Sequence, residues 1–197
     1  MDVWENLSYG QHPTQKMDVW ELNDLAPRAG WPALLCFSDG TPKNKVGKTQ
    51  NWLQGPLFAR KGLLVAHAKM RWEEAQEWSD LQQDATAAIH RLPSLQINPK
   101  RIGLWGFGLG GILAIRAAEE LGAEHIHAAV SLGDPEPPLP PRLDVPIALG
   151  GGLPEEMLFR RSGPSSIRVQ QQALKWTVSR LADKQRGSKW KIRRKKK

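Results

Sequence analysis

A glycine-rich hexapeptide is the feature of this 197-residue sequence that bears most directly on chemistry. It follows the apolar run Arg101 to Trp105 and precedes a helix predicted from Ile112 to Leu121. A strand, a tight glycine turn and a helix form a nucleophile elbow, Gly-x-Ser-x-Gly, in which a strained turn exposes an attacking hydroxyl above a sheet. Gly108 stands at the serine position and has no hydroxyl. The residues of the hexapeptide are Gly106, Phe107, Gly108, Leu109, Gly110 and Gly111.

The same glycines match a second pattern, the dinucleotide fingerprint Gly-x-Gly-x-x-Gly. Gly106, Gly108 and Gly111 have its spacing between a predicted strand and a predicted helix. Backbone N–H groups at a helix N-terminus attract phosphate, and Asp134, after the next predicted strand, stands about where a ribose-binding acid is expected. An NAD-type nucleotide is therefore an alternative ligand, although such fingerprints usually open their domain and this one begins at residue 106.

The predicted elements around the hexapeptide indicate an α/β fold. Its strands are apolar throughout and are separated by helices, which predicts a mostly parallel sheet with helices on both faces, in three layers. The expected strands are Pro32–Phe37, Gly62–Ala66, Arg101–Trp105, His127–Leu132 and Val145–Leu149. The expected helices are Pro56–Lys61, Glu73–Leu92, Ile112–Leu121 and Ser166–Leu181.

Charge divides the sequence into a body and a tail. The formal net charge is +8, yet nine of the 28 Lys and Arg residues fall in residues 184–197, which contain no acid. The remainder carries 19 basic against 20 acidic residues. A run of like charges repels itself and cannot be buried. We therefore predict a single domain over residues 1–183 and a disordered basic tail over 184–197, capable of non-specific contacts with anionic partners.

Cysteine and histidine usage points to no disulfide, metal or cofactor. Cys36, the single cysteine, lies in an apolar run and is expected to be a buried thiol. The histidines have no zinc-binding spacing, so no metal and no cofactor are predicted. The sequence from Met1 to Asn6 has no apolar leader, and no stretch is long enough to span a bilayer. A cytoplasmic location is the resulting expectation.

The order of several motifs resembles a known family. Between Tyr9 and Asp134 the chain is similar to α/β-hydrolase esterases of the carboxylesterase, feruloyl-esterase-like and kynurenine-formamidase-like group. The resemblance implies an α/β-hydrolase fold, degenerate here and C-terminally shortened. Arg71, Trp78 and Asp84 stand where that family has an arginine, a tryptophan and a helix aspartate. The stretches that carry the resemblance are Tyr9–Pro13, Gln15–Trp20, Gly55–Val65, Ile97–Leu104 and the hexapeptide.

The departures from the family fall on its chemistry. Its oxyanion loop, His-Gly-Gly, corresponds to Ser38, Asp39 and Gly40, and its nucleophile corresponds to Gly108. Residues 150–154 offer no carboxylate where the family has its acid, and the sequence has no histidine after His127. Losing the nucleophile or its base costs up to about 10⁶ in rate. The resemblance therefore implies an elbow without an intact catalytic triad.

Other side chains are weak substitutes. The remaining histidines are interpreted as structural or exposed, because no neighbouring residues form with them the pattern of a catalytic base. Ser131, at the end of a predicted strand with Asp134 shortly after it, is the alternative nucleophile, although it lacks an elbow. The histidines considered are His67, His90, His125 and His127.

The sequence thus favours a degenerate esterase-like protein without serine-esterase activity, able to bind a small-molecule ligand or a partner protein. The candidate ligand-binding residues are Gly106, Gly108, Gly111, Ser131 and Asp134. Two alternatives stay open: an NAD-type nucleotide-binding protein that uses three of these glycines with Asp134, and a hydrolase with a non-standard nucleophile. A gene product without selected activity is a further possibility.

Overall fold

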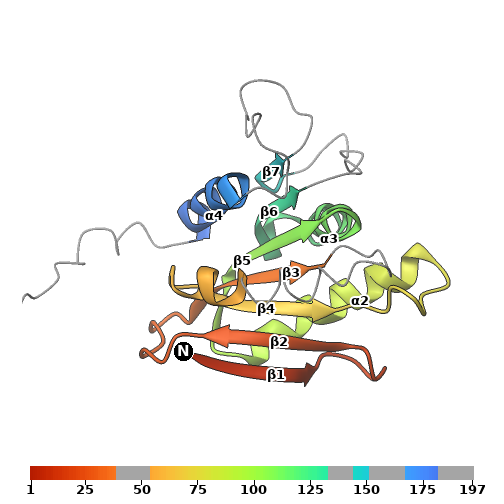
Figure 1. Ribbon diagram of the computed structural model, residues 1–197, viewed down its shortest axis with the longest axis horizontal. Coiled ribbons are helices and arrows are strands. Elements are labelled where there is room, and N and C mark those ends of the chain that lie inside the picture. The colour runs from red at the N-terminus through yellow and green to blue at the C-terminus, as the bar shows by residue number, and fades with distance from the viewer. Residues whose placement is uncertain (39–53, 133–143, 151–166, 182–197) are drawn as a thin grey trace, which may run out of the picture.

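In a computed structural model the chain is described at residues 1–38, 54–132, 144–150 and 167–181, with only the backbone at 149–150 and 167–171. A seven-stranded sheet runs through it in the order β1-β2-β4-β3-β5-β6-β7 (Figure 1). From β4 to β7 neighbouring strands are parallel, whereas β1 and β2 are antiparallel to each other and β2 to β4. The strands are β1 Asp2–Ser8, β2 Lys16–Glu21, β3 Trp31–Phe37, β4 Leu64–Lys69, β5 Ile97–Phe107, β6 Ile126–Leu132 and β7 Ile147–Gly150.

Helices cover both faces of the sheet, as predicted. The helices α2, Trp78–Arg91, and α3, Leu109–His125, pack against one face of the sheet. They contribute Leu81, Ala85, Leu113 and Ala117 to the core on that face. The helix α4, Ile167–Leu181, and the helical residues 54–59 contribute Leu174 and Phe58 to a second core on the other face. The fold is therefore three-layered α/β. All seven side chains of β3 are buried between the helical layers, which explains the uninterrupted apolar run from Trp31.

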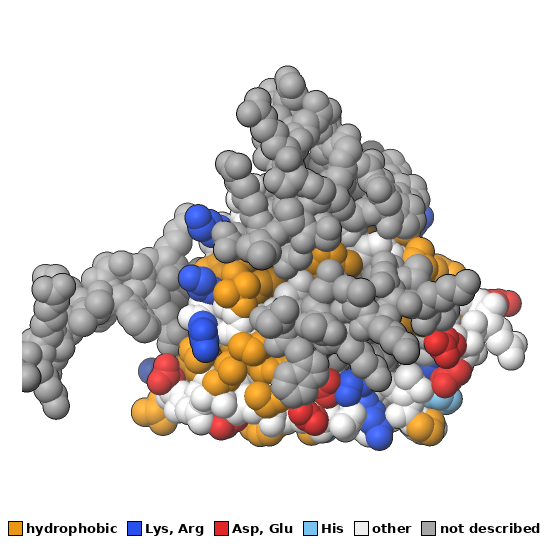
Figure 2. Space-filling model, viewed as in Figure 1, with side chains coloured by type: hydrophobic (Ala, Val, Ile, Leu, Met, Phe, Trp, Pro, Cys, Tyr) orange, Lys and Arg blue, Asp and Glu red, His pale blue; other side chains and the backbone are white. Residues whose placement is uncertain are grey.

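Side chains of opposite charge are mixed on the exposed edge. Figure 2 shows acidic and basic side chains interspersed along the edge formed by β1 and β2.

No helix of the described residues is long and apolar enough to cross a membrane. The predicted basic tail, 184–197, lies outside the described residues, so the domain boundary at 183 stays a prediction.

Several predicted boundaries differ from those of the structure. The helix expected from Glu73 begins at Trp78, because Glu77 and Asp80 form a reciprocal capping box at its N-terminus. The helix predicted from Ile112 to Leu121 begins at Leu109; it is interrupted after Leu121 by the non-helical Gly122, where φ is 66° and ψ is 179°, and helical residues then continue to His125. The strand β5 begins at Ile97 rather than Arg101, through pairing of Ile97 with Trp31.

The remaining predicted elements shift by a few residues. The observed strands are 31–37 (predicted 32–37), 64–69 (predicted 62–66), 126–132 (predicted 127–132) and 147–150 (predicted 145–149). The observed helices are 54–59 (predicted 56–61) and 167–181 (predicted 166–181).

Candidate functional site

The turn between β5 and α3 has the strand-turn-helix geometry predicted at the hexapeptide. Gly108 is the N-cap residue of α3, with φ 50° and ψ −123°. Its N–H donates a 2.8 Å hydrogen bond to the Leu132 carbonyl at the end of β6, and its own carbonyl accepts from the Gly111 N–H at 2.9 Å. Positive φ with strongly negative ψ is unfavourable for a residue with a side chain. The chain therefore makes the sharp corner of an elbow with the one residue type that adopts it without strain.

The flanking glycines are needed because three segments meet at this corner. A Cβ on Gly106 would overlap the backbone of Gly110 and Gly111. A Cβ on Gly110 would overlap the Ser38 carbonyl oxygen and lie 2.7 Å from that of Phe37. The end of β3, the end of β5 and the first turn of α3 are thus in direct backbone contact, which gives Gly106 and Gly110 a steric role inside the protein.

Ser38 is the one residue of the predicted oxyanion loop that the structure places. It follows β3 directly, and its Oγ accepts a 3.3 Å hydrogen bond from Nε1 of Trp72, in the segment between β4 and α2. Asp39 and Gly40 lie outside the described residues. Sequence reasoning did not foresee this hydrogen bond, since the two residues are 34 positions apart and Trp72 belongs to no motif.

Ser131 lies beneath the corner rather than within it. It is in β6, 3% exposed, and its Oγ lies where a Cβ on Gly111 would be. This hydroxyl has no hydrogen-bond partner in the part of the chain that is described. An activated serine needs a base within hydrogen-bonding reach, and none of the described residues supplies one here. Asp134, the acid predicted beside it, lies outside the described residues.

The histidines lie away from the corner or are engaged elsewhere. His67 is buried in β4, between Cys36 and Asp18 in register, and burial lowers its pKa to about 4, with Asp18 partly opposing the shift. His90 is exposed near the end of α2. His127 is the second residue of β6, at the opposite end of this strand from Leu132 and Gly108, and burial lowers its pKa. Among the described residues, no histidine hydrogen-bonds to the hexapeptide or to Ser131.

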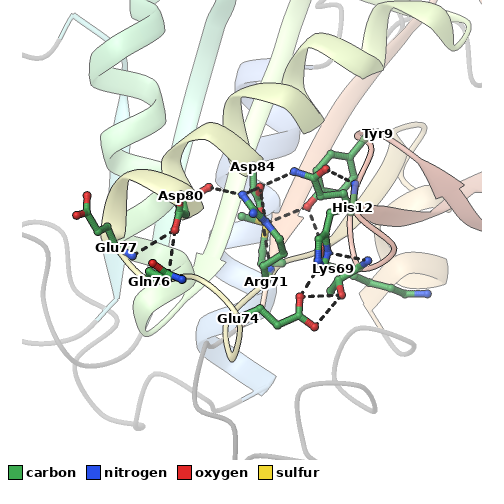
Figure 3. A network of polar contacts seen from close by, with 12 residues as sticks. Tyr9, His12, Lys69, Arg71, Glu74, Gln76, Glu77, Asp80 and Asp84 are labelled. Carbon is green, nitrogen blue, oxygen red and sulfur yellow. Dashed lines mark hydrogen bonds and ion pairs between the residues drawn. The ribbon is translucent and has the colours of Figure 1, made fainter.

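The segment that carries Trp72 is held by a buried ion pair (Figure 3). The fully buried Asp84 of α2 accepts bonds from Arg71 at 2.6 Å and 3.0 Å and a 2.6 Å bond from Gln15 Nε2. Its carboxylate raises the pKa of the Arg71 guanidinium, mainly through these hydrogen bonds. Tyr9 donates to the Lys69 carbonyl at 2.8 Å, and burial raises the pKa of its phenol. The turn between β1 and β2 thus anchors the start of the Trp72 segment.

Several solved structures with a similar architecture are esterases. Esterase 2 of Thermogutta terrifontis, in a form phosphoramylated by tabun, matches with a TM-score of 0.62 and 16% identity over 92% of this chain and 97% of that chain. Esterase B of Lactobacillus rhamnosis matches with a TM-score of 0.54 and 18% identity, over 66% of this chain and 47% of that chain. The chain has an α/β-hydrolase fold.

The α/β-hydrolase fold is shared at low sequence identity. An esterase of Pyrobaculum calidifontis also matches, with a TM-score of 0.54 and 19% identity, over 66% of this chain and 44% of that chain. The chain spans about half the length of the Lactobacillus rhamnosis esterase that it matches. No family model and no curated protein sequence matches it. The likeness therefore shows the fold in which the β5–α3 corner lies. What this corner can do chemically has to be argued from its own residues.

The unpartnered hydroxyl of Ser131 leads to a stability prediction. Ser131→Ala is expected to raise the free energy of unfolding by about 1 kcal/mol, because a buried hydroxyl without a partner costs about 1–3 kcal/mol. Chemical denaturation followed by circular dichroism measures this change. Thr177→Val is the control, since the buried Thr177 hydroxyl donates a 2.8 Å bond to the Ala173 carbonyl. A loss of stability in Ser131→Ala would show that this hydroxyl has a partner beyond the described residues.

Proposed function

We propose that this chain is an esterase-fold protein that does not hydrolyse esters by a serine mechanism and instead binds a small-molecule ligand at the β5–α3 corner. The observation that supports this is Gly108, which has the backbone conformation of an elbow, φ 50° and ψ −123°, and no hydroxyl. We infer that glycine occupies the position of the fold's nucleophile, in a turn of the shape that would present it. Two serines lie next to that corner, but Ser38 Oγ accepts a bond from Trp72, Ser131 is buried in β6, and no histidine of the described residues hydrogen-bonds to either.

The first turn of α3 provides the chemistry for such a ligand. The N-terminus of a helix carries unpaired backbone N–H groups and a partial positive charge, which favour an anionic or carbonyl oxygen. The first turn of α3 contains no acidic residue that would compete for these groups. With glycine at position 108, no side chain extends from the N-cap over them. The ligand proposed for this end of the helix is therefore one with a carboxylate or ester oxygen.

The alternatives from the sequence find less support. The dinucleotide spacing of Gly106, Gly108 and Gly111 does not require a nucleotide, because Gly106 and Gly111 each have a steric neighbour within the protein. The non-standard nucleophile Ser131 is buried without a base among the described residues. Both alternatives remain testable, and their outcomes differ from those expected for the ligand-binding protein.

Gly108→Ser tests the missing nucleophile. The serine is expected to cost about 1–3 kcal/mol of stability, because φ 50° is strained for any side chain. It is also expected to give no gain in hydrolysis of p-nitrophenyl acetate, since no described histidine lies in hydrogen-bonding contact with the corner. Gly108→Ala is the matched control, because it introduces the same strain without a hydroxyl.

Three outcomes of these assays contradict the proposal. Hydrolysis by Gly108→Ser that exceeds Gly108→Ala by more than about tenfold would show that a base is in place. Turnover by the unchanged protein that Ser131→Ala abolishes would establish the non-standard nucleophile. Saturable quenching of tryptophan fluorescence by NAD, weakened in Gly108→Ala, would favour the nucleotide-binding alternative.

A further inference from the structure

A groove runs along the outer surface between α2 and α3. It consists of two adjoining hollows of about 730 Å³ and 530 Å³, which share Gln82 and Glu120 in their walls. The first hollow begins at Trp78 and the second extends to His90. At 1.5 Å per residue, this stretch of α2 is about 18 Å long, the length of about twelve residues of helix. The groove is thus elongated and open to solvent rather than enclosed.

One end of the groove is apolar. Leu109 and Ile112, in the first turn of α3, are partly exposed there and belong to neither of the two cores of the described residues. Trp78 of α2 faces them across the hollow and packs on the core behind it. A contiguous apolar patch on a protein surface is a candidate interaction site, and these three side chains form the apolar end of this groove.

The centre of the groove is acidic. Arg116 pairs with Glu119 at 2.9 Å, so these two charges offset each other. Glu120 is exposed, lines both hollows, and forms no ion pair with any described residue. A single uncompensated carboxylate therefore lies about two helical turns beyond Ile112, in the wall that the two hollows share. Its charge is complementary to a lysine or arginine.

The geometry points to a docking site for a basic amphipathic helix of a partner protein. Such a helix lays an apolar stripe at spacing i, i+3, i+4 and i+7 into a groove of this form. Its apolar side chains would cover Trp78, Leu109 and Ile112, and one basic side chain would reach Glu120. The length of the groove and the position of its charge favour this occupant over a small molecule. This inference concerns a protein partner and does not rest on the proposed function.

The test uses the full chain and a fluorescein-labelled peptide of about twelve leucine and lysine residues, with leucines at helical spacing. Fluorescence anisotropy is expected to show saturable binding. Glu120→Lys is expected to weaken it about fivefold or more, because it replaces an attractive charge by a repulsive one. Glu124→Lys is the matched control, since Glu124 is exposed on the same helix but lines neither hollow. This control is expected to change affinity by less than about twofold.

Three results would overturn the site. Equal weakening by the two variants would show attraction to the general charge of α3, and equal binding of a peptide with glutamate in place of lysine would exclude charge recognition. Absence of saturable binding up to about 1 mM peptide would exclude the groove as a peptide site. Backbone hydrogen exchange localises the contact, which is expected to slow exchange in α2 and the start of α3 and to leave α4 unchanged. Thermal unfolding of each variant establishes that it is folded.

Discussion

Asp84→Asn is expected to lower the free energy of unfolding by about 3 kcal/mol, because removing one partner of a buried ion pair leaves the other uncompensated. The Asp84 side chain is fully buried and that of Arg71 is 21% exposed. The amide keeps the size of the carboxylate and removes its charge, so Arg71 and Gln15 both lose a charged acceptor. Urea denaturation followed by circular dichroism measures the change.

An exposed pair of the same chemistry serves as the control. Arg116 and Glu119 also form an arginine–carboxylate bond, 2.9 Å long, with both side chains 35% exposed. Glu119→Gln is expected to cost less than about 0.5 kcal/mol, because solvent screens such pairs. If the two substitutions cost the same, burial does not decide the strength of the Asp84 pair. In that case the segment before Trp72 is held by other contacts.

Gly106→Ala is expected to cost about 2–3 kcal/mol, because a methyl group there overlaps the backbone of α3 rather than a movable side chain. Relief requires α3 to move away from β5, which disturbs the packing of both. The substitution changes no charge and no hydrogen-bonding group. The same denaturation measurement applies, together with a thermal midpoint that is expected to fall.

Gly103→Ala is the matched control in the same strand. A Cβ at Gly103 meets a terminal methyl group of Leu181 at 2.8 Å and one of Leu34 at 3.2 Å. These side-chain ends can rotate, so the expected cost is below about 1 kcal/mol. A Gly103→Ala variant as unstable as Gly106→Ala would mean that close approach of α3 to β5 is not what fixes glycine at position 106.

The fold was largely predictable because buried parallel strands leave a strong trace in sequence. The strand β3 reads as an unbroken apolar run, and β6 as an apolar run interrupted by His127 and Ser131, because helices cover both faces of these strands. The strand β1 left no such trace, since it is an edge strand with six of its seven residues exposed. Its existence depends on pairing with β2, which local sequence does not encode.

The candidate site was predictable only where backbone geometry dictates residue type. A corner at φ 50° and a close helix–strand approach both demand glycine, so the hexapeptide was visible in the sequence. The contact of Trp72 with Ser38 and that of Gln15 with Asp84 join residues 34 and 69 positions apart. Side-chain hydrogen bonds of this kind follow from the assembled sheet and have no local pattern.

The two cores give the chain an optical property. Trp31, Trp72 and Trp78 belong to the layer of α2 and α3, whereas Trp20, Trp105 and Trp176 belong to the layer of α4. Intrinsic emission is therefore a sum of signals from opposite sides of the sheet. Phenylalanine at position 78 or 105 would silence one emitter on one side. Comparing ligand titrations of Trp78→Phe and Trp105→Phe with those of the unchanged chain would then show which of these two tryptophans the ligand perturbs.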